Sequence, residues 1–143
     1  MALHIQVVSF GFKYGVPSPP PQASQTLQLD CRGLPNPYWD EALRAFCGLD
    51  APIDAFMQQH PPVLDFAQSV WKQVTTALSQ ISPTTTSSPS LFVALGCTGG
   101  RHRSVWQAAK LAKALSQQGH QVSLKHLHLN NDAHSVAETP PAL

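Results

Sequence analysis

One short segment of this 143-residue chain carries most of its recognisable chemistry, the sequence GCTGGRHRS at residues 96–104. It follows an apolar run at 91–95, which is typical of a strand covered on both faces. After it, apolar residues recur at helical spacing over 102–118. The first amides of a helix lack partners within the helix, and together with the helix dipole they favour an anion. The segment therefore predicts a glycine-rich, phosphate-binding loop between a strand and a helix.

The side chains of this segment suit a phosphate group. Its paired glycines let the backbone approach a ligand closely, and its two arginines carry charge and donors for phosphate oxygens. Its hydroxyls add donors, and its histidine adds a charge that depends on pH. The predicted ligand-binding residues of the segment are Cys97, Thr98, Gly99, Gly100, Arg101, His102, Arg103 and Ser104. The alternative is a plain strand-to-helix turn with solvated arginines. The segment is not a nucleotide-binding Walker loop, because the Walker spacing and its lysine are absent.

An enzyme is the competing interpretation of the same residues. Cys97, Arg103 and Ser104 follow the Cys-x5-Arg-Ser pattern of cysteine-dependent phosphatases, in which a thiolate attacks phosphorus. Asp40 is a conceivable general acid. Gly96, however, stands where those phosphatases have a histidine. We therefore expect binding without catalysis and keep the phosphatase as the alternative.

The rest of the chain predicts an α/β fold, a single-domain sheet with helices packed on it, over residues 1–129. Strands are expected at 4–9, 26–32, 91–95 and 121–127, and helices at 39–46, 50–59, 61–81 and 102–118. The stretch 91–127 is a strand–loop–helix–strand unit, which requires parallel strands. The low-complexity stretch 82–90 predicts a linker, and 130–143 predicts a frayed, flexible tail.

Composition narrows the class of protein. Hydrophobic residues make up 43% and charged residues 12%, yet no run is long enough to span a bilayer. Three cysteines without paired spacing and the lack of a signal peptide favour a cytoplasmic protein with reduced thiols. No acidic residue lies between Asp65 and Asp132, so one face is expected to meet anions. No cofactor is expected. A metal site is not expected either, because His126 and His128 share a strand face without a third ligand.

Several separate motifs occur in a fixed order: SFGFKYG at 9–15, DCRGLPNP at 30–37, then Trp39-Asp40 and the loop at 96–105. Over about residues 5–127 this series resembles the C-terminal domain of the RapZ family of bacterial RNase adapter proteins. The resemblance implies a pocket for glucosamine-6-phosphate that includes Cys97, Thr98, Gly99, His102 and Arg103. It also implies RNA binding, through which the family guides an endoribonuclease to small RNAs. The family's nucleotide-binding N-terminal domain is missing, so we expect a stand-alone version of the C-terminal domain.

Other residues extend this hypothesis. Lys13 and Arg32 follow predicted strand ends and are expected at the same pocket, although an ion pair with Asp30 is a second account of Arg32. Tyr38 stands where family members have a histidine, which bears on the identity of the ligand. The strongly basic C-terminal end of the family carries few charges in this chain, which predicts few phosphate contacts and weak RNA binding. The predicted RNA-contacting residues are Lys110, Lys113, Lys125, His126 and His128. The expected partners are a phosphorylated small molecule, a small RNA, an endoribonuclease and a second copy of the chain, with no membrane.

Overall fold

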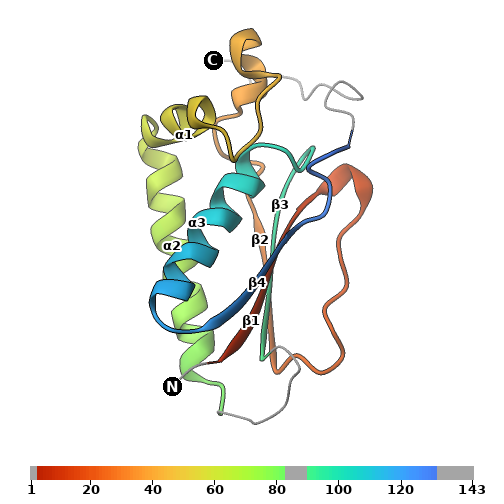
Figure 1. The fold of residues 1–143 in the computed structure, drawn as a ribbon, viewed down its shortest axis with the longest axis vertical. Coiled ribbons are helices and arrows are strands. Elements are labelled where there is room, and N and C mark those ends of the chain that lie inside the picture. The colour runs from red at the N-terminus through yellow and green to blue at the C-terminus, as the bar shows by residue number, and fades with distance from the viewer. Residues whose placement is uncertain (1–2, 83–89, 132–143) are drawn as a thin grey trace.

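The fold is built on a parallel β-sheet, seen in a computed structural model that describes residues 3–82 and 90–131. The strands are β1 (His4–Gly11), β2 (Gln25–Asp30), β3 (Leu91–Cys97) and β4 (Gln121–His126), in the sheet order β2-β3-β1-β4. Every neighbouring pair is parallel, with Ile5 opposite both Leu91 and Val122. All four carboxyl ends therefore meet at one edge of the sheet, as Figure 1 shows.

Three α-helices of the described residues pack on one face of the sheet (Figure 1). They are α1 (Ala51–Gln58), α2 (Pro61–Ser79) and α3 (Arg103–Gln117). The main hydrophobic core lies between these helices and the sheet. It includes Ile5, Val7, Val93 and Leu95 of the strands and Val70, Val74, Leu111 and Leu115 of the helices. Alternate strand residues point to this face, as the period of a β-strand requires.

The opposite face of the sheet carries a smaller apolar cluster of Val8, Phe10, Phe92 and Ala94. The connection from β1 to β2 contains no α-helix, and it covers this cluster with Phe12 and Ala23. Its end is tied to the sheet because the backbone amides of residues 24 and 25 both donate to the Ser90 carbonyl. The fold is therefore asymmetric, with helices on one face and mainly a loop on the other.

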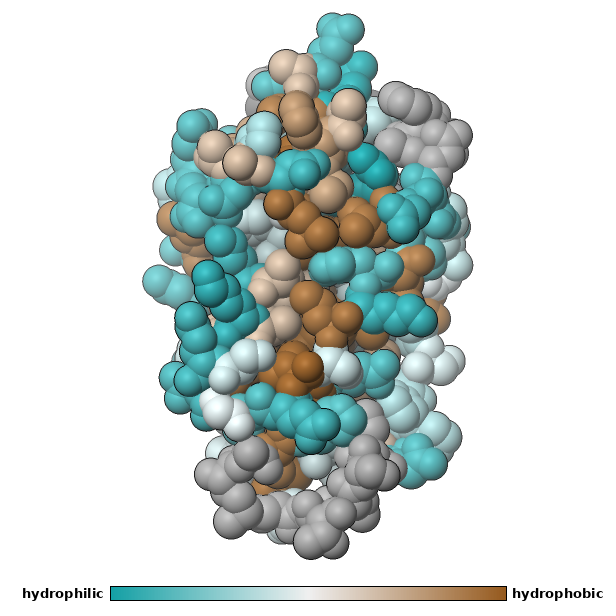
Figure 2. Space-filling view, viewed as in Figure 1, coloured by the Kyte–Doolittle hydropathy of each residue, from teal (hydrophilic) through white to brown (hydrophobic). Residues whose placement is uncertain are grey.

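The outer strand β4 is only partly covered. Its residues are mostly exposed, and Leu124 keeps 41% of its accessible surface. Figure 2 shows apolar surface running down the middle of the view, where α3 and β4 lie in Figure 1. None of the helices in residues 3–82 and 90–131 combines the length and apolarity that crossing a membrane would take.

The predicted strands and three of the four predicted helices are confirmed, with shifted ends. The helix predicted over 39–46 is wrong, because this segment forms two short 3-10 turns, η2 (Pro37–Trp39) and η3 (Glu41–Leu43). The Asn36 side chain accepts from the Tyr38 amide and the Asp40 side chain from the Ala42 amide, each at 3.0 Å. Such local side-chain bonds compete with a continuous helix. Most of the linker predicted at 82–90 and of the tail predicted at 130–143 lies outside the described residues.

Candidate anion-binding site

The predicted site residues come together at the carboxyl edge of the sheet. β1 ends at Gly11, β2 at Asp30 and β3 at Cys97, and the loop of residues 98–102 leads from β3 into α3. The Lys13 amide donates to the Thr98 carbonyl at 3.3 Å. Segments that are far apart in the sequence are thus in contact here, as parallel strands require.

The two adjacent glycines of the loop have opposite surroundings. Gly100 has φ +74°, and a Cβ atom there would lie 2.7 Å from the Gly11 nitrogen. A Cβ on Gly11 would in turn lie 2.6 Å from the Gly99 carbonyl carbon, so this backbone contact requires glycine on both sides. A Cβ on Gly99, however, would have no neighbour within 4 Å. The loop is therefore packed against β1 on one side and open at Gly99.

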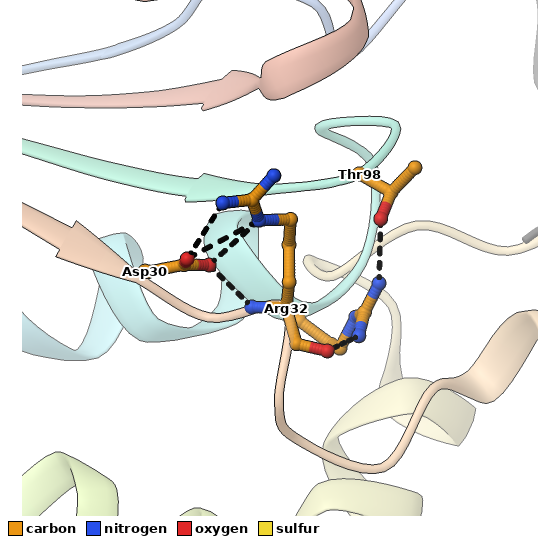
Figure 3. Close-up of polar contacts among 4 residues, drawn as sticks. Asp30, Arg32 and Thr98 are labelled. Carbon is orange, nitrogen blue, oxygen red and sulfur yellow. Dashed lines mark hydrogen bonds and ion pairs between the residues drawn. The ribbon is translucent and has the colours of Figure 1, made fainter. Parts of the chain in front are cut away.

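Arg103 begins α3 and is only 2% exposed. Its Nη1 donates to the Arg32 carbonyl at 2.7 Å and to the Leu34 carbonyl at 3.1 Å. Its Nη2 donates to the Thr98 hydroxyl at 3.5 Å, and Figure 3 shows how this guanidinium connects Arg32 with Thr98. The arginine thus fixes the turn after β2 against the loop, and it places a positive charge beside Thr98.

Arg32 forms the ion pair with Asp30 that was the second account of its role. The Arg32 Nη2 lies 2.8 Å from an Asp30 carboxylate oxygen, and both side chains are about half exposed, at 48% and 50% (Figure 3). The guanidinium also stacks over the Phe12 ring at 3.7 Å. Hydrogen bonds from Arg32 lower the pKa of Asp30. The charge of Arg32 is therefore held at the carboxyl edge, beside the loop.

The sulfur of Cys97 points into the protein. Cys97 is 2% exposed, and its Sγ lies 3.1 Å from the Oγ of Ser104, which is fully buried. The Ser104 hydroxyl also donates to the Phe10 carbonyl at 3.3 Å. Both side chains therefore support the loop from beneath, and their expected contact with a ligand stays a prediction.

His102 is buried and holds the loop to a distant segment. Its Nε2 lies 2.6 Å from the Phe46 carbonyl, so this nitrogen carries the proton and donates. Burial is the main cause that lowers the pKa of His102 from 6.5 to about 4. The pH-dependent charge expected of His102 therefore forms only at acidic pH, because burial penalises the charged imidazolium.

Arg101 and Lys13 are the remaining predicted cations at this edge. Arg101 is half-buried, and its guanidinium donates to the Leu129 carbonyl at 2.9 Å and to the Ala45 carbonyl at 3.3 Å. The Lys13 ammonium lies 5.1 Å from the centre of the Tyr14 ring. Arg101 thus joins the loop to the segments before α1 and after β4, while its charge stays partly accessible.

Tyr38 lies in η2 and contacts its own segment. Its carbonyl accepts from the Arg44 Nε at 2.7 Å, and the Arg44 guanidinium lies 5.0 Å from the centre of its ring. Near it, a hollow of about 820 Å³ is lined by Leu34, Trp39, Phe56 and their neighbours. The expected contact of Tyr38 with a ligand stays a prediction.

Sequence reasoning missed the positions of His126 and His128. The Nδ1 of His128 accepts from the Gly11 amide at 2.8 Å, and the Nδ1 of His126 lies 2.6 Å from the Ser9 hydroxyl. Burial lowers the pKa of both histidines. The expectation that both histidines share a strand face is wrong, because β4 ends at His126 and His128 lies in the bend after it. They tie the end of β4 to the end of β1, the strand on which the loop packs.

The three lysines predicted to contact RNA are all exposed, Lys110 and Lys113 on α3 and Lys125 on β4. Lys110 lies 3.1 Å from the Asp54 carboxylate, so part of its charge is balanced. Within residues 3–82 and 90–131, no three His, Cys, Asp or Glu side chains gather in a way that could hold a metal ion.

The fold and this edge define a class of protein, a parallel α/β domain with a glycine-rich loop between its central strand and a helix. Residues 3–130 match the model of the family described as the RapZ C-terminal domain, and the chain belongs to that family. Similar proteins are a nucleotide-binding protein of Vibrio campbellii, 43% identical over 87% of this chain and 41% of its own length, and one of Shewanella woodyi, 41% identical over 91% and 44%. A nucleotide-binding protein of Vibrio cholerae is 41% identical over 85% and 40%. The chain thus spans less than half the length of these relatives.

Proposed function

We propose that this chain is a non-catalytic regulatory domain that binds a phosphorylated metabolite at the loop of residues 98–102. The open side of Gly99, in front of the N-terminus of α3, is the observation that carries the proposal. The first amides of a helix favour an anion at such a place. The charge of Arg103 beside Thr98 adds to this preference.

Phosphate is the chemical group that the candidate ligands share. The similar proteins are named as nucleotide-binding, and the family resemblance implies glucosamine-6-phosphate. A nucleotide and a sugar phosphate would present the same group to the loop. We favour the sugar phosphate, because the family match covers the C-terminal domain and the Walker spacing is absent from this chain.

Calorimetry with four ligands tests this proposal: glucosamine-6-phosphate, unphosphorylated glucosamine, AMP and inorganic phosphate. We expect glucosamine-6-phosphate to bind most tightly and glucosamine not to bind. Gly99→Ala is expected to weaken binding several-fold because its Cβ enters the open space, whereas Lys72→Ala on the exposed side of α2 is the matched control. Equal affinity for glucosamine and its phosphate would contradict the proposal, and so would unchanged affinity in Gly99→Ala.

Weak RNA binding is a second function that specific residues favour. The exposed Lys110, Lys113 and Lys125 lie in the stretch that lacks acidic residues. Each contact between a lysine and a phosphate releases counterions, so binding should fall steeply as salt rises. Gel shifts with a structured small RNA over a salt series measure this, with Lys113→Ala expected to reduce both affinity and salt slope. Absence of a shift at low salt would remove RNA from the function and, with it, the role as an adapter for an endoribonuclease.

The phosphatase alternative is less well supported by the geometry. A nucleophile must reach the phosphorus atom, but Cys97 is 2% exposed and directed at Ser104. The conceivable acid, Asp40, caps η3 through the Ala42 amide. We expect no phosphate release from a panel of phosphoesters above the rate without protein. Turnover that disappears in Cys97→Ser would establish the enzyme instead.

A further inference from the structure

The register of β2 and β3 brings two cysteines side by side. The last aligned pair of these strands is Asp30 opposite Gly96, so the next positions are Cys31 and Cys97. The Cys31 amide donates to the Gly96 carbonyl at 2.7 Å, which continues the parallel pairing by one residue. Figure 1 shows β2 and β3 as neighbours along their length.

The two cysteines also lie on the same face of the sheet, the face that the helices cover. Both belong to the main core between sheet and helices, with exposures of 0% for Cys31 and 2% for Cys97. The Arg103 guanidinium joins the Arg32 carbonyl to the Thr98 hydroxyl, and each of these residues directly follows one of the cysteines. The backbone just after the pair is therefore held together by Arg103.

Such a placement suits a disulfide bond. Neighbouring strands lie about 4.8 Å apart, and disulfides join cysteines whose Cα atoms are roughly 4.4–6.8 Å apart. We propose that Cys31 and Cys97 form a reversible disulfide beneath the anion-binding loop. The oxidant would be a small-molecule disulfide such as oxidised glutathione.

The exchange balances in two steps. The Cys97 thiolate attacks one sulfur of the small disulfide, which forms a mixed disulfide and releases one small thiolate. The Cys31 thiolate then attacks the Cys97 sulfur and releases the second small thiolate. The protons lost by the two cysteines end on the released thiolates, so two protein thiols are oxidised and one small disulfide is reduced.

Burial makes this exchange slow. It raises the pKa of the Cys31 thiol, and a charge on Cys97 would raise it further, so little Cys31 thiolate exists in the closed fold. Both steps therefore require transient opening of the turn at residues 31–34, because Cys97 is itself only 2% exposed. A thiol of this kind responds to a lasting change of redox conditions rather than to a brief one.

The consequence for the loop rests on the proposed function. In the reduced protein the Cys97 Sγ lies 3.1 Å from the Ser104 Oγ in the first turn of α3. A bond to Cys31 would draw the sulfur away from Ser104 and change the way the chain enters the helix. We expect the oxidised protein to bind glucosamine-6-phosphate several-fold more weakly than the reduced protein.

Peptide mapping of the full chain tests the bond directly. The reduced protein is incubated with oxidised glutathione for hours, and a second sample is refolded from urea in the same buffer so that burial cannot hide an allowed bond. Free thiols are then alkylated, and tryptic cleavage separates the cysteines into peptides 14–32, 45–72 and 73–101. We expect peptides 14–32 and 73–101 linked, with the loss of two hydrogen atoms, and Cys47 alkylated.

Variants and a separate binding measurement make the outcomes distinct. Cys47→Ala should still form the bond, and Cys31→Ala should leave glutathione on Cys97. A link through Cys47, glutathione retained on wild-type Cys97, or three alkylated thiols in both samples would overturn the proposal. If the bond forms and glucosamine-6-phosphate affinity is unchanged, the effect on the loop is overturned. If the reduced protein binds none of the phosphates, the proposed function fails while the disulfide stands.

Discussion

The loop after β3 has an inner and an outer side, which differ in burial and in their contacts with the rest of the chain. The inner side, defined by Gly100, His102, Arg103 and Ser104, is buried and bonded to three distant parts of the chain. The outer side, defined by Thr98, Gly99 and Arg101, is partly exposed. A motif that resembles an anion site as a whole is therefore divided, with its inner residues building the loop and its outer residues left to meet a ligand.

The largest difference between the sides is expected at the adjacent glycines. Gly100→Ala should lower the free energy of unfolding by about 4 kcal/mol, because a left-handed backbone is strained for alanine and its Cβ would lie 2.7 Å from the Gly11 nitrogen. Gly99→Ala, the matched control, should change stability by less than about 0.5 kcal/mol. Urea denaturation measures both. Equal losses would show that the two sides do not differ.

The next effect is a dependence of stability on pH through His102. Its pKa is about 4 in the folded protein, against 6.5 for an unperturbed histidine, so the unfolded chain binds more protons between these values. Stability is therefore complete above pH 6.5 and falls as the pH decreases toward 4, by roughly 2–4 kcal/mol.

Urea denaturation at several pH values checks this dependence. His102→Gln, which keeps a donor for the Phe46 carbonyl, should flatten the curve in this range. Part of the slope should remain, because burial also lowers the pKa of His126 and His128. An unchanged slope in the variant would mean that the inner histidine is not the group that titrates.

Arg103→Ala is expected to cost about 2 kcal/mol of stability and several-fold in glucosamine-6-phosphate affinity. The substitution removes the donor to the Arg32 and Leu34 carbonyls as well as the charge beside Thr98. Arg101→Ala on the outer side should cost no more than about 1 kcal/mol, since that side chain is partly solvated. Thermal melts and calorimetry separate the two quantities. A larger stability loss in Arg101→Ala would reverse the assignment of inner and outer arginines.

The smallest effect is expected at the exposed ion pair beside the loop. Asp30→Asn breaks the pair with Arg32, whose side chains are 50% and 48% exposed, so stability should fall by less than about 1 kcal/mol. Phosphate affinity should stay equal or rise slightly, because an opposing charge leaves the carboxyl edge. Calorimetry in low salt is the suitable measurement. A marked loss of affinity would show that the outer edge depends on this carboxylate.

The position of the loop was predictable from sequence because its signals are local. An apolar run followed at once by glycines and then by helical spacing places a loop at the end of a buried strand. The same locality explains the strands and the long helices. The segment 39–46 was mispredicted as a helix because the Asn36 and Asp40 side chains each close a short turn. Their capping competes with helical spacing, and composition does not show which of the two wins.

The division of the loop into two sides could not be predicted, because it depends on contacts across the chain. His102 is buried by its bond to Phe46, a residue 56 positions earlier. Arg101 and Arg103 look alike in sequence and both donate to distant carbonyls, yet Arg103 is buried and Arg101 stays partly exposed. The pairing of Cys31 with Cys97 likewise depends on strand register. Only the tertiary arrangement tells a residue that supports the loop from one that faces solvent.

The strand order β2-β3-β1-β4 also has a consequence for the folding pathway. β1 and β2 do not pair with each other, so both lack a neighbour until β3 is available. A chain emerging from the ribosome therefore cannot begin this sheet before residues 91–97 have appeared. Most of its strand contacts are non-local, which is typical of slow folders. Because β3 also leads into the loop, the strand that allows the first pairings of the sheet also positions the candidate site.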